Sequence, residues 1–233
     1  MPLRIDALIF DLDGTLADSI ADIGTAMNAV LKSLSLEPHS LDAYKRFVGE
    51  GAENLVRRSI LARVPELPEP VTELCEAYRA EYAKLEHESS TLYPGIEAML
   101  EGVVLRRRKM AVLSNKRDDF TKHLVAQALG RFSFVDVRGE REGVPRKPDP
   151  TAAFELALEL NVLPERIGFV GDTPIDVKTA RNAGMISLAA LWGFRTRDEL
   201  EAAGASSFLT KPADLLAILD AGQISRQVCW GSR

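Results

Sequence analysis

Short segments that are apolar throughout alternate with helical patterns along most of this chain, and this alternation constrains the fold more than any other feature. Six segments are predicted to be strands: Ala7–Phe10, Met110–Leu113, Phe134–Val137, Ile167–Val170, Ile186–Leu191 and, with a weaker pattern, Ser207–Leu209. Helical patterns at Phe120–Leu129, Thr151–Leu160 and Ile175–Ala183 lie between them. Strands without polar alternation are typical of a parallel sheet that helices cover on both faces. The sequence therefore predicts an α/β fold.

One long segment interrupts this alternation. Residues 18–90 contain no convincing strand, and their helical patterns fall at Ile20–Leu34, Leu41–Val48, Ala52–Ala62 and Pro70–Glu86. Tyr93-Pro94-Gly95 marks the return to the main domain. We therefore expect residues 1–17 and 91–233 to form a discontinuous α/β domain and residues 18–90 to form an inserted helical domain. The polar residues from Gly222 to Arg233 are expected to be a frayed tail.

The composition excludes several classes of protein. The chain has 233 residues, of which 46% are hydrophobic, enough for one large domain or two smaller ones. Its formal net charge of −5 argues against a nucleic-acid partner. Its cysteines, Cys75 and Cys229, are far apart and in no metal-ligand spacing. Because we see neither a secretory leader nor an apolar run long enough for a membrane, we expect a cytoplasmic protein, as a monomer or homodimer.

Polar residues follow three of the predicted strands at the point where each strand ends. Asp11 and Asp13 follow the predicted strand Ala7–Phe10. Ser114-Asn115 follows Met110–Leu113, and Gly171-Asp172 follows Ile167–Val170. Ligands bind outside the carboxyl ends of the strands in an open parallel sheet, so these groups converge if the strands are neighbours. Lys147, which precedes a predicted helix, adds a cation.

These residue types suit phosphoryl transfer. Clustered aspartates without histidine or cysteine favour a hard cation, usually Mg²⁺, which leaves coordination positions to water and phosphate. An aspartate can attack phosphorus and form an aspartyl phosphate, provided that a metal and a lysine offset its charge. A second acid two residues on can protonate the leaving oxygen and then accept a proton from water.

With these residues in order, the chain resembles the haloacid dehalogenase-like hydrolases. It carries all four family motifs: Asp11-Leu-Asp13-Gly-Thr15, Ser114-Asn115, Lys147-Pro148 and Gly171-Asp172-Thr-Pro-Ile-Asp176. The resemblance implies a Rossmann-like parallel-sheet core with an inserted α-helical cap that closes over the site and sets substrate choice.

The resemblance also implies a role for each motif residue. Asp11 would be the nucleophile and a metal ligand. Asp13 would be the general acid and base, with its backbone carbonyl on Mg²⁺. The phosphate would be held by Ser114, the neighbouring amide of Asn115, and Lys147, which also balances charge. Asp172 would be a metal ligand, and Asp176 would support the metal site from one helical turn away.

Within the family, the chain looks most like the phosphoglycolate phosphatases. The segments that carry this likeness are Asp18-Ser19, Val48-Gly49-Glu50-Gly51-Ala52, Leu55-Val56, Ala183-Gly184 and Trp192-Gly193-Phe194. The likeness implies a Mg²⁺-dependent hydrolase of a small phosphate monoester, with 2-phosphoglycolate as the leading substrate. The cap loop Gly49, Glu50 and Gly51 is expected to contact that substrate.

Three other functions remain open on the sequence alone. A phosphomutase of the β-phosphoglucomutase type would use the same intermediate and return the phosphoryl group to a sugar. A pyrophosphatase or a broad sugar-phosphate phosphatase would share the site but not the substrate. A non-catalytic phosphate-binding regulatory protein on the same fold would have no need of both Asp11 and Asp13.

Overall fold

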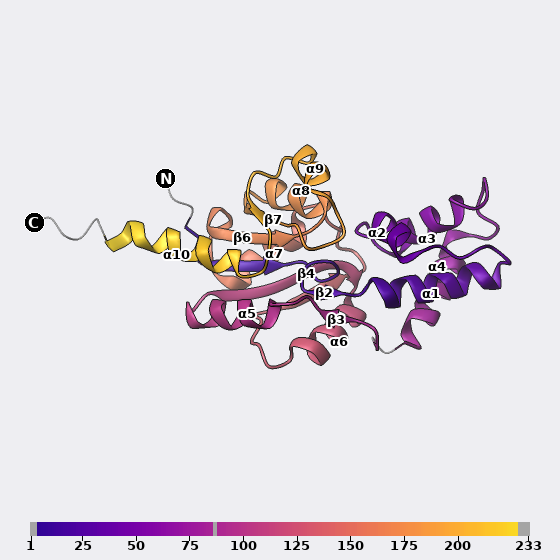
Figure 1. Cartoon of the computed structure of the whole chain (residues 1–233), viewed down its shortest axis with the longest axis horizontal. Coiled ribbons are helices and arrows are strands. Elements are labelled where there is room, and N and C mark those ends of the chain that lie inside the picture. Colours follow the sequence, from indigo (N-terminus) through magenta and orange to yellow (C-terminus); the bar gives the residue numbers. More distant parts are fainter. Residues whose placement is uncertain (1–3, 86–87, 228–233) are drawn as a thin grey trace, which may run out of the picture.

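The computed structural model describes residues 4–85 and 88–227, and its centre is a six-stranded sheet in the order β5-β4-β1-β6-β7-β8 (Figure 1). Every pairing in this sheet is parallel. The strands are β1 (Ala7–Phe10), β4 (Lys109–Arg117), β5 (Val137–Glu140), β6 (Ile167–Gly171), β7 (Ile186–Ala190) and β8 (Phe208–Leu209). The predicted α/β class is therefore confirmed.

Strand β1 shows why the sheet needs helices on both faces. All four of its residues are buried. Leu8 and Phe10 pack into one apolar cluster, whereas Ala7 and Ile9 pack into another, because successive side chains of a strand point to opposite faces. Since both faces are covered, the strand carries no polar alternation.

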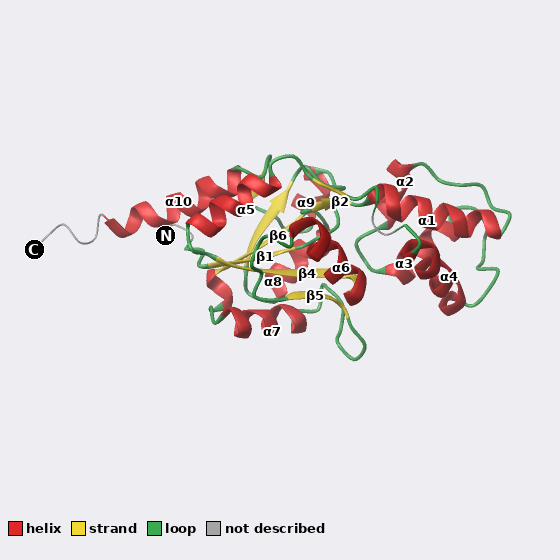
Figure 2. Ribbon diagram, turned by 90° about the horizontal axis from the view of Figure 1, so that it is seen from below, coloured by secondary structure: helices red, strands yellow, loops and turns green. Residues whose placement is uncertain are grey.

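The two clusters are completed by different helices (Figure 2). The cluster around Phe10 receives apolar residues from α5 (Ile96–Leu105), α6 (Asp118–Leu129) and α10 (Asp214–Gln227). The cluster around Ile9 receives residues from α7 (Thr151–Leu160) and α8 (Pro174–Asn182). The 3-10 helix η1 (Pro164–Arg166) leads into β6, and α9 (Arg197–Ala202) packs on α8.

A group of four helices lies at one end of the molecule, opposite α10 (Figure 1). These helices are α1 (Ile20–Ser33), α2 (Leu41–Phe47), α3 (Ala52–Leu61) and α4 (Val71–Ala83). They share an apolar cluster centred on Met27, Tyr44 and Ile60, which also includes Phe194 from the sheet domain. The chain leaves and re-enters the sheet domain through a short antiparallel ladder of β2 (Ala17–Asp18) and β3 (Thr91–Leu92).

Several elements differ from the sequence prediction. The strand predicted at Phe134–Val137 is β5 at Val137–Glu140, where Arg138 forms ion pairs with Asp136, Glu155 and Glu159. The strand predicted to end at Leu113 continues to Arg117, although its pairing with β5 is irregular after Leu113. Helices α5, α9 and α10 and the β2–β3 ladder were not predicted.

The end of the chain also differs from the prediction. The prediction of a frayed tail from Gly222 is wrong as far as Gln227, because α10 includes these residues. Residues 228–233 lie outside the described part of the chain. No helix in the described part of the chain has the length and apolar character needed to cross a membrane.

Candidate active site

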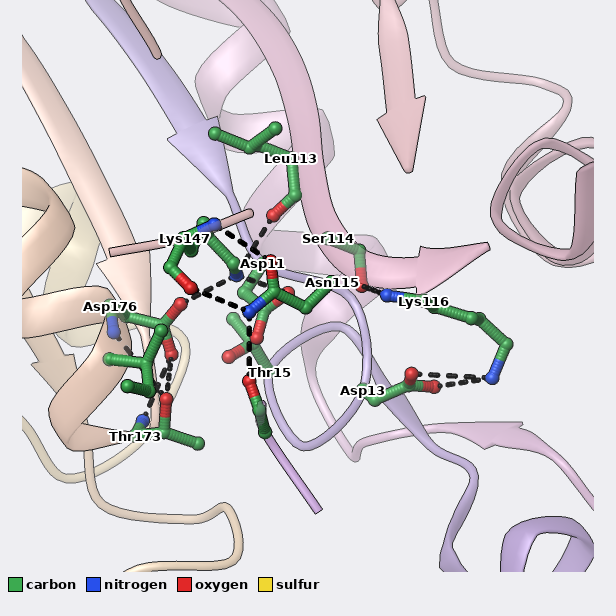
Figure 3. Close-up of polar contacts among 12 residues, drawn as sticks. Asp11, Asp13, Thr15, Leu113, Ser114, Asn115, Lys116, Lys147, Thr173 and Asp176 are labelled. Atoms are coloured by element: carbon green, nitrogen blue, oxygen red, sulfur yellow. Dashed lines mark hydrogen bonds and ion pairs between the residues drawn. The ribbon is translucent and has the colours of Figure 1, made fainter. Parts of the chain in front are cut away.

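The predicted site residues lie together at the carboxyl ends of three adjacent strands (Figure 3). Asp11 and Asp13 follow β1, Ser114 and Asn115 lie within β4, and Asp172 follows β6. Strands β4 and β6 flank β1 on either side, which brings these separated parts of the sequence to one edge of the sheet. The remaining members, Lys147 and Asp176, come from the segment before α7 and the first turn of α8.

Lys147 lies at the centre of the cluster. Its Nζ atom is 2.9 Å from Asp11 Oδ1 and 2.7 Å from Asp176 Oδ1, and it donates to the Leu113 carbonyl at 3.1 Å. Burial alone would lower the pKa of this ammonium, but Asp11 and Asp176 raise the pKa above its ordinary value. The lysine therefore remains charged although it is buried.

Asp11, Asp172 and Asp176 form a carboxylate triad, in which one oxygen from each lies within 4.8 Å of the others. All three side chains are buried. Burial and the charge of Asp176 raise the pKa of Asp11 to about 7. Burial, together with Asp176 and Asp11, also raises the pKa of Asp172 well above its usual value. One lysine thus leaves the negative charge of the triad incompletely offset.

This donor set fits a hard divalent cation. It offers only carboxylate oxygens, which Mg²⁺ and similar ions prefer. A bound cation would also remove the mutual repulsion that raises the pKa values of Asp11 and Asp172. The triad is therefore a candidate metal site.

Asp172 is held from both sides. Its Oδ1 accepts a hydrogen bond from Thr15 Oγ1 at 2.9 Å, and its Oδ2 accepts one from the backbone N–H of Phe194 at 2.8 Å. A Cβ atom on Gly193 would lie 2.3 Å from Asp172 Cβ, so the residue before Phe194 has no room for a side chain. In the sequence, Trp192-Gly193-Phe194 carries only a family likeness; in the structure, this segment holds the Asp172 carboxylate.

Asp176 is occupied by protein groups at both oxygens. Oδ1 pairs with Lys147, and Oδ2 accepts hydrogen bonds from Thr173 N at 3.0 Å and Thr173 Oγ1 at 2.7 Å. The second set caps the N-terminus of α8. Asp176 thus already faces the Lys147 ammonium, whereas Asp172 forms no ion pair in the described part of the chain, and this difference favours Asp172 as the metal ligand and a supporting role for Asp176.

The Asp13 carboxylate lies outside the triad (Figure 3). Its Oδ1 accepts from Ser19 Oγ at 2.5 Å and from Lys116 Nζ at 3.0 Å, and Lys116 also lies 3.2 Å from Oδ2. The Lys116 ammonium stands 4.4 Å from the centre of the Tyr82 ring. Lys116 is not among the site residues predicted from the sequence, although it directly follows Ser114-Asn115.

Asn115 joins the sheet domain to the helices. Its Nδ2 donates to the Lys147 carbonyl at 3.0 Å and to the Gly49 carbonyl at 3.1 Å, and its Oδ1 accepts from Lys147 N at 2.9 Å. The side chain therefore positions Lys147 and the loop at Gly49.

A cavity opens over the cluster between the sheet domain and the helices. Asp11, Asp13, Ser114 and Asn115 line its floor, and residues of α3, α4 and the loop before α3 line its roof. Of the three cap-loop residues predicted to contact substrate, Gly49 and Gly51 line the cavity. Glu50 is not among its lining residues, because its carboxylate turns to Arg58.

Comparison with known proteins decides the family. Residues 8–190 match the family described as Haloacid dehalogenase-like hydrolase. This chain belongs to that family. It is 31% identical over 215 residues to a phosphoglycolate phosphatase of Aquifex aeolicus (strain VF5), covering 91% of this chain and 96% of the relative. A phosphoglycolate phosphatase of Pseudomonas putida is also 31% identical, covering 91% and 78%.

Solved structures of the haloacid dehalogenase-like family show the same fold. A putative phosphoglycolate phosphatase from Lactobacillus delbrueckii subsp. bulgaricus superposes with a TM-score of 0.86 at 27% identity, covering 93% of this chain and 98% of that one. A predicted phosphoglycolate phosphatase from Haemophilus somnus 129Pt gives 0.83 at 25% identity, covering 92% and 97%. The expected resemblance to phosphoglycolate phosphatases, which are phosphoric monoester hydrolases, is therefore confirmed.

Proposed function

We propose that this chain is a Mg²⁺-dependent phosphatase that hydrolyses 2-phosphoglycolate, a small phosphate monoester, through an aspartyl-phosphate intermediate. The observation that supports it most is the position of Asp11, which lines the cavity and is paired with Lys147 beneath it. Asp13, on the same cavity wall, is held apart from the triad by Ser19 and Lys116. The names of the relatives support the choice of substrate.

In the first step, the Asp11 carboxylate attacks phosphorus while Asp13 gives its proton to the departing oxygen of the substrate. Ser114, the main-chain amide of Asn115 and Lys147 hold the phosphoryl oxygens, and Lys147 offsets the charge of the attacking carboxylate. Mg²⁺, held by Asp11, Asp172 and the backbone carbonyl of Asp13, would stabilise negative charge on the phosphoryl group.

In the second step, Asp13 accepts a proton from the water that attacks the aspartyl phosphate. In the structure, Ser19 and Lys116 hold the Asp13 carboxyl in place on the cavity wall. Hydrolysis then frees phosphate and restores Asp11.

Residues 18–90 act as the cap in this proposal, and residues 1–17 and 91–233 act as the catalytic core. The contacts that join the two include Asn115 to the Gly49 carbonyl at 3.1 Å, and Arg195 to the Val48 and Arg46 carbonyls at 3.0 and 3.1 Å. A cap held in this way excludes bulk water from the intermediate and places its own side chains over the substrate.

The test is phosphate release from a substrate panel with and without Mg²⁺. The panel holds 2-phosphoglycolate, pyrophosphate, β-glucose 1-phosphate, glucose 6-phosphate and an aryl phosphate. We expect 2-phosphoglycolate to lead in kcat/KM by at least about 100-fold, a ratio that corresponds to about 3 kcal/mol in the transition state, and only with Mg²⁺. Asp11→Asn should remove turnover and leave the folded state intact.

Each rival function predicts a different result from the panel. A phosphomutase would convert β-glucose 1-phosphate to an isomer without net phosphate release, and a broad phosphatase would hydrolyse the panel evenly. A regulatory binding protein would turn over none of the substrates. Near-wild-type turnover by Asp11→Asn would overturn the mechanism whichever substrate leads.

A further inference from the structure

Arg79, on the cap helix α4, brings a positive charge to the cavity. It lines the cavity above Asp11 and Asp13, beside Tyr78 and Tyr82 from the same helix. Its neighbours in the cavity roof are uncharged: Val48, Gly49, Gly51, Ala52 and Leu55. Within the described residues, Arg79 is thus the one charged side chain that the cap contributes to this cavity.

The other charged residues of the cavity each have a partner of opposite sign. Asp11 pairs with Lys147, Asp13 pairs with Lys116, and Arg117 pairs with Asp119. Arg79 differs from all of them. It forms no ion pair within the described part of the chain, and its Nε is buried with no hydrogen-bond acceptor. Four other arginines also have a buried Nε without an acceptor, but each of them forms an ion pair through another nitrogen. Among the described residues Arg79 alone combines a buried Nε without an acceptor and the lack of an ion pair, and native structures leave few such donors unsatisfied.

The chemistry of a guanidinium indicates what would satisfy it. Its planar fork of N–H donors matches the two oxygens of a carboxylate, and its charge is permanent. A phosphate monoester bound at Asp11 has its phosphoryl group on the core and its remaining atoms toward the cap. A substrate with a carboxylate at that end presents it to the cap side of the cavity, which Arg79 lines.

We infer that Arg79 binds the carboxylate of the substrate and thereby makes the enzyme selective for small phosphate monoesters that carry a second, carboxylate anion. This inference rests on the proposed function and names the residue that would enforce it. Arg79 acts on substrate choice, whereas the charges around Asp11 and Asp13 act on the phosphoryl group that all phosphate monoesters share.

A second cavity provides the competing explanation. Arg79 also borders a hollow walled by Glu53, Glu76 and Glu140, where it could simply balance acidic side chains. Two of these glutamates already have other partners. Glu53 pairs with Arg57 at 2.9 Å, and Glu140 lies 3.5 Å from Arg146. A role limited to charge balance would make Arg79 matter for stability but not for the choice between substrates.

The experiment measures a ratio of two kcat/KM values in the full-length enzyme with Mg²⁺. The substrates are 2-phosphoglycolate and 2-hydroxyethyl phosphate, which differ by a carboxylate in place of a neutral CH₂OH. We expect Arg79→Gln to lower this ratio by about 10- to 100-fold, mainly through KM for 2-phosphoglycolate, because one charge-assisted pair is lost. Arg79→Lys should lower it less, since a point charge remains but the fork does not.

The matched control is Arg57→Gln. It removes one positive charge from the cap at a side chain that pairs with Glu53 and does not line the cavity. We expect the ratio to stay within about 2-fold of wild type, since Arg57 is exposed, does not line the cavity and is screened by salt. Thermal unfolding of each variant separates a loss of selectivity from a loss of folded protein.

The outcomes separate the two claims. Equal losses on both substrates in Arg79→Gln and Arg79→Lys would overturn the inference while the proposed function stands. A wild-type enzyme that prefers 2-hydroxyethyl phosphate or the sugar phosphates would overturn the inference together with the choice of substrate. A wild-type preference for the carboxylate substrate that disappears in Arg79→Gln but persists in Arg57→Gln would support both.

Discussion

The Lys147 ammonium lies 2.9 Å from an oxygen of Asp11, and both side chains are almost fully buried. The ion pair does not balance the charge of the site, because the carboxylates of Asp172 and Asp176 lie beside Asp11. One cation facing three acids makes the site sensitive both to loss of the lysine and to gain of a metal.

Replacing Lys147 tests the first of these effects. Lys147→Met would leave Asp11 and Asp176 without their common cation, and loss of one partner of a buried ion pair costs about 3–5 kcal/mol. We expect a decrease of that size in the free energy of unfolding, measured by urea denaturation without metal near pH 8.

Lys178→Met is the control for this measurement. Lys178 is an exposed residue of the same helix that carries Asp176, and its loss should change stability by less than about 0.5 kcal/mol. Equal losses in the two variants would mean that Lys147 is not the counter-ion of the triad.

The raised pKa of Asp11 predicts how stability depends on pH. Its pKa of about 7 in the metal-free folded protein compares with 3.8 in the unfolded chain, so the folded state holds a proton that the unfolded state has lost between these values. Its contribution to stability is therefore complete below pH 3.8 and is lost as pH rises through 7. Metal-free protein should become easier to unfold from about pH 5 to about pH 8.

Mg²⁺ should reverse this trend, because a bound cation favours the ionised form of Asp11. The increase in melting temperature on adding Mg²⁺ should thus be larger at pH 8 than at pH 5. Asp11→Asn isolates the effect of the triad, since the difference between wild type and variant cancels the titrating groups that do not face Asp11. A Mg²⁺ effect that is the same at both pH values would contradict the assignment of the titration to Asp11.

The part of the fold that the sequence predicts well is the part with one dominant pattern. Segment Ala7–Phe10 is apolar at every position because both faces of β1 are buried, and Thr151–Leu160 has its apolar residues at helical spacing. Helix α5 was missed for the opposite reason. Its last residues, Val104 and Leu105, are 48% and 82% exposed although they are apolar, which obscures the buried stripe.

The candidate site also has a part that the sequence predicts and a part that it does not. Asp11, Ser114 and Asp172 follow from the sequence because parallel strands bring their carboxyl ends to one edge. The pairing of Asp13 with Lys116 does not follow from the sequence, since 103 residues separate them. The apolar pattern of a strand does not specify the side-chain direction of the residues after it. Arg79 depends on how the cap sits over the core, which helical spacing within the cap does not specify.

Replacing Gly193 should weaken Mg²⁺ binding although no charged group is removed. A Cβ atom here would lie 2.3 Å from both Asp172 Cβ and the Gly14 carbonyl, so Gly193→Ala must displace Asp172. We expect Mg²⁺ affinity to fall by about 10- to 100-fold, as for other changes that disturb the orientation of a ligand. Activity as a function of Mg²⁺ concentration measures it.

The control for this variant is Gly184→Ala. Gly184 has a positive φ of 66° but nothing within 4 Å of its added Cβ, so this substitution strains the backbone without touching Asp172. It should reduce stability and leave the apparent Mg²⁺ affinity near wild type. If both variants weaken Mg²⁺ equally, the effect of Gly193→Ala comes from general destabilisation.

Replacing Lys116 should lower the catalytic rate without affecting metal binding. Its Nζ contacts both oxygens of Asp13, and its side chain is 7% exposed, so it fixes the direction of the carboxyl that we propose transfers protons. Lys116→Met should lower kcat by about 10- to 100-fold on every substrate, since small displacements of a catalytic group cost rates of this order. Apparent Mg²⁺ affinity should change little, because the Asp13 carboxylate lies outside the triad. Lys122→Met, which removes an exposed lysine paired with Asp118 on the following helix, should leave kcat near wild type. A Lys116 variant that raises KM at unchanged kcat would instead make this lysine a substrate-binding residue.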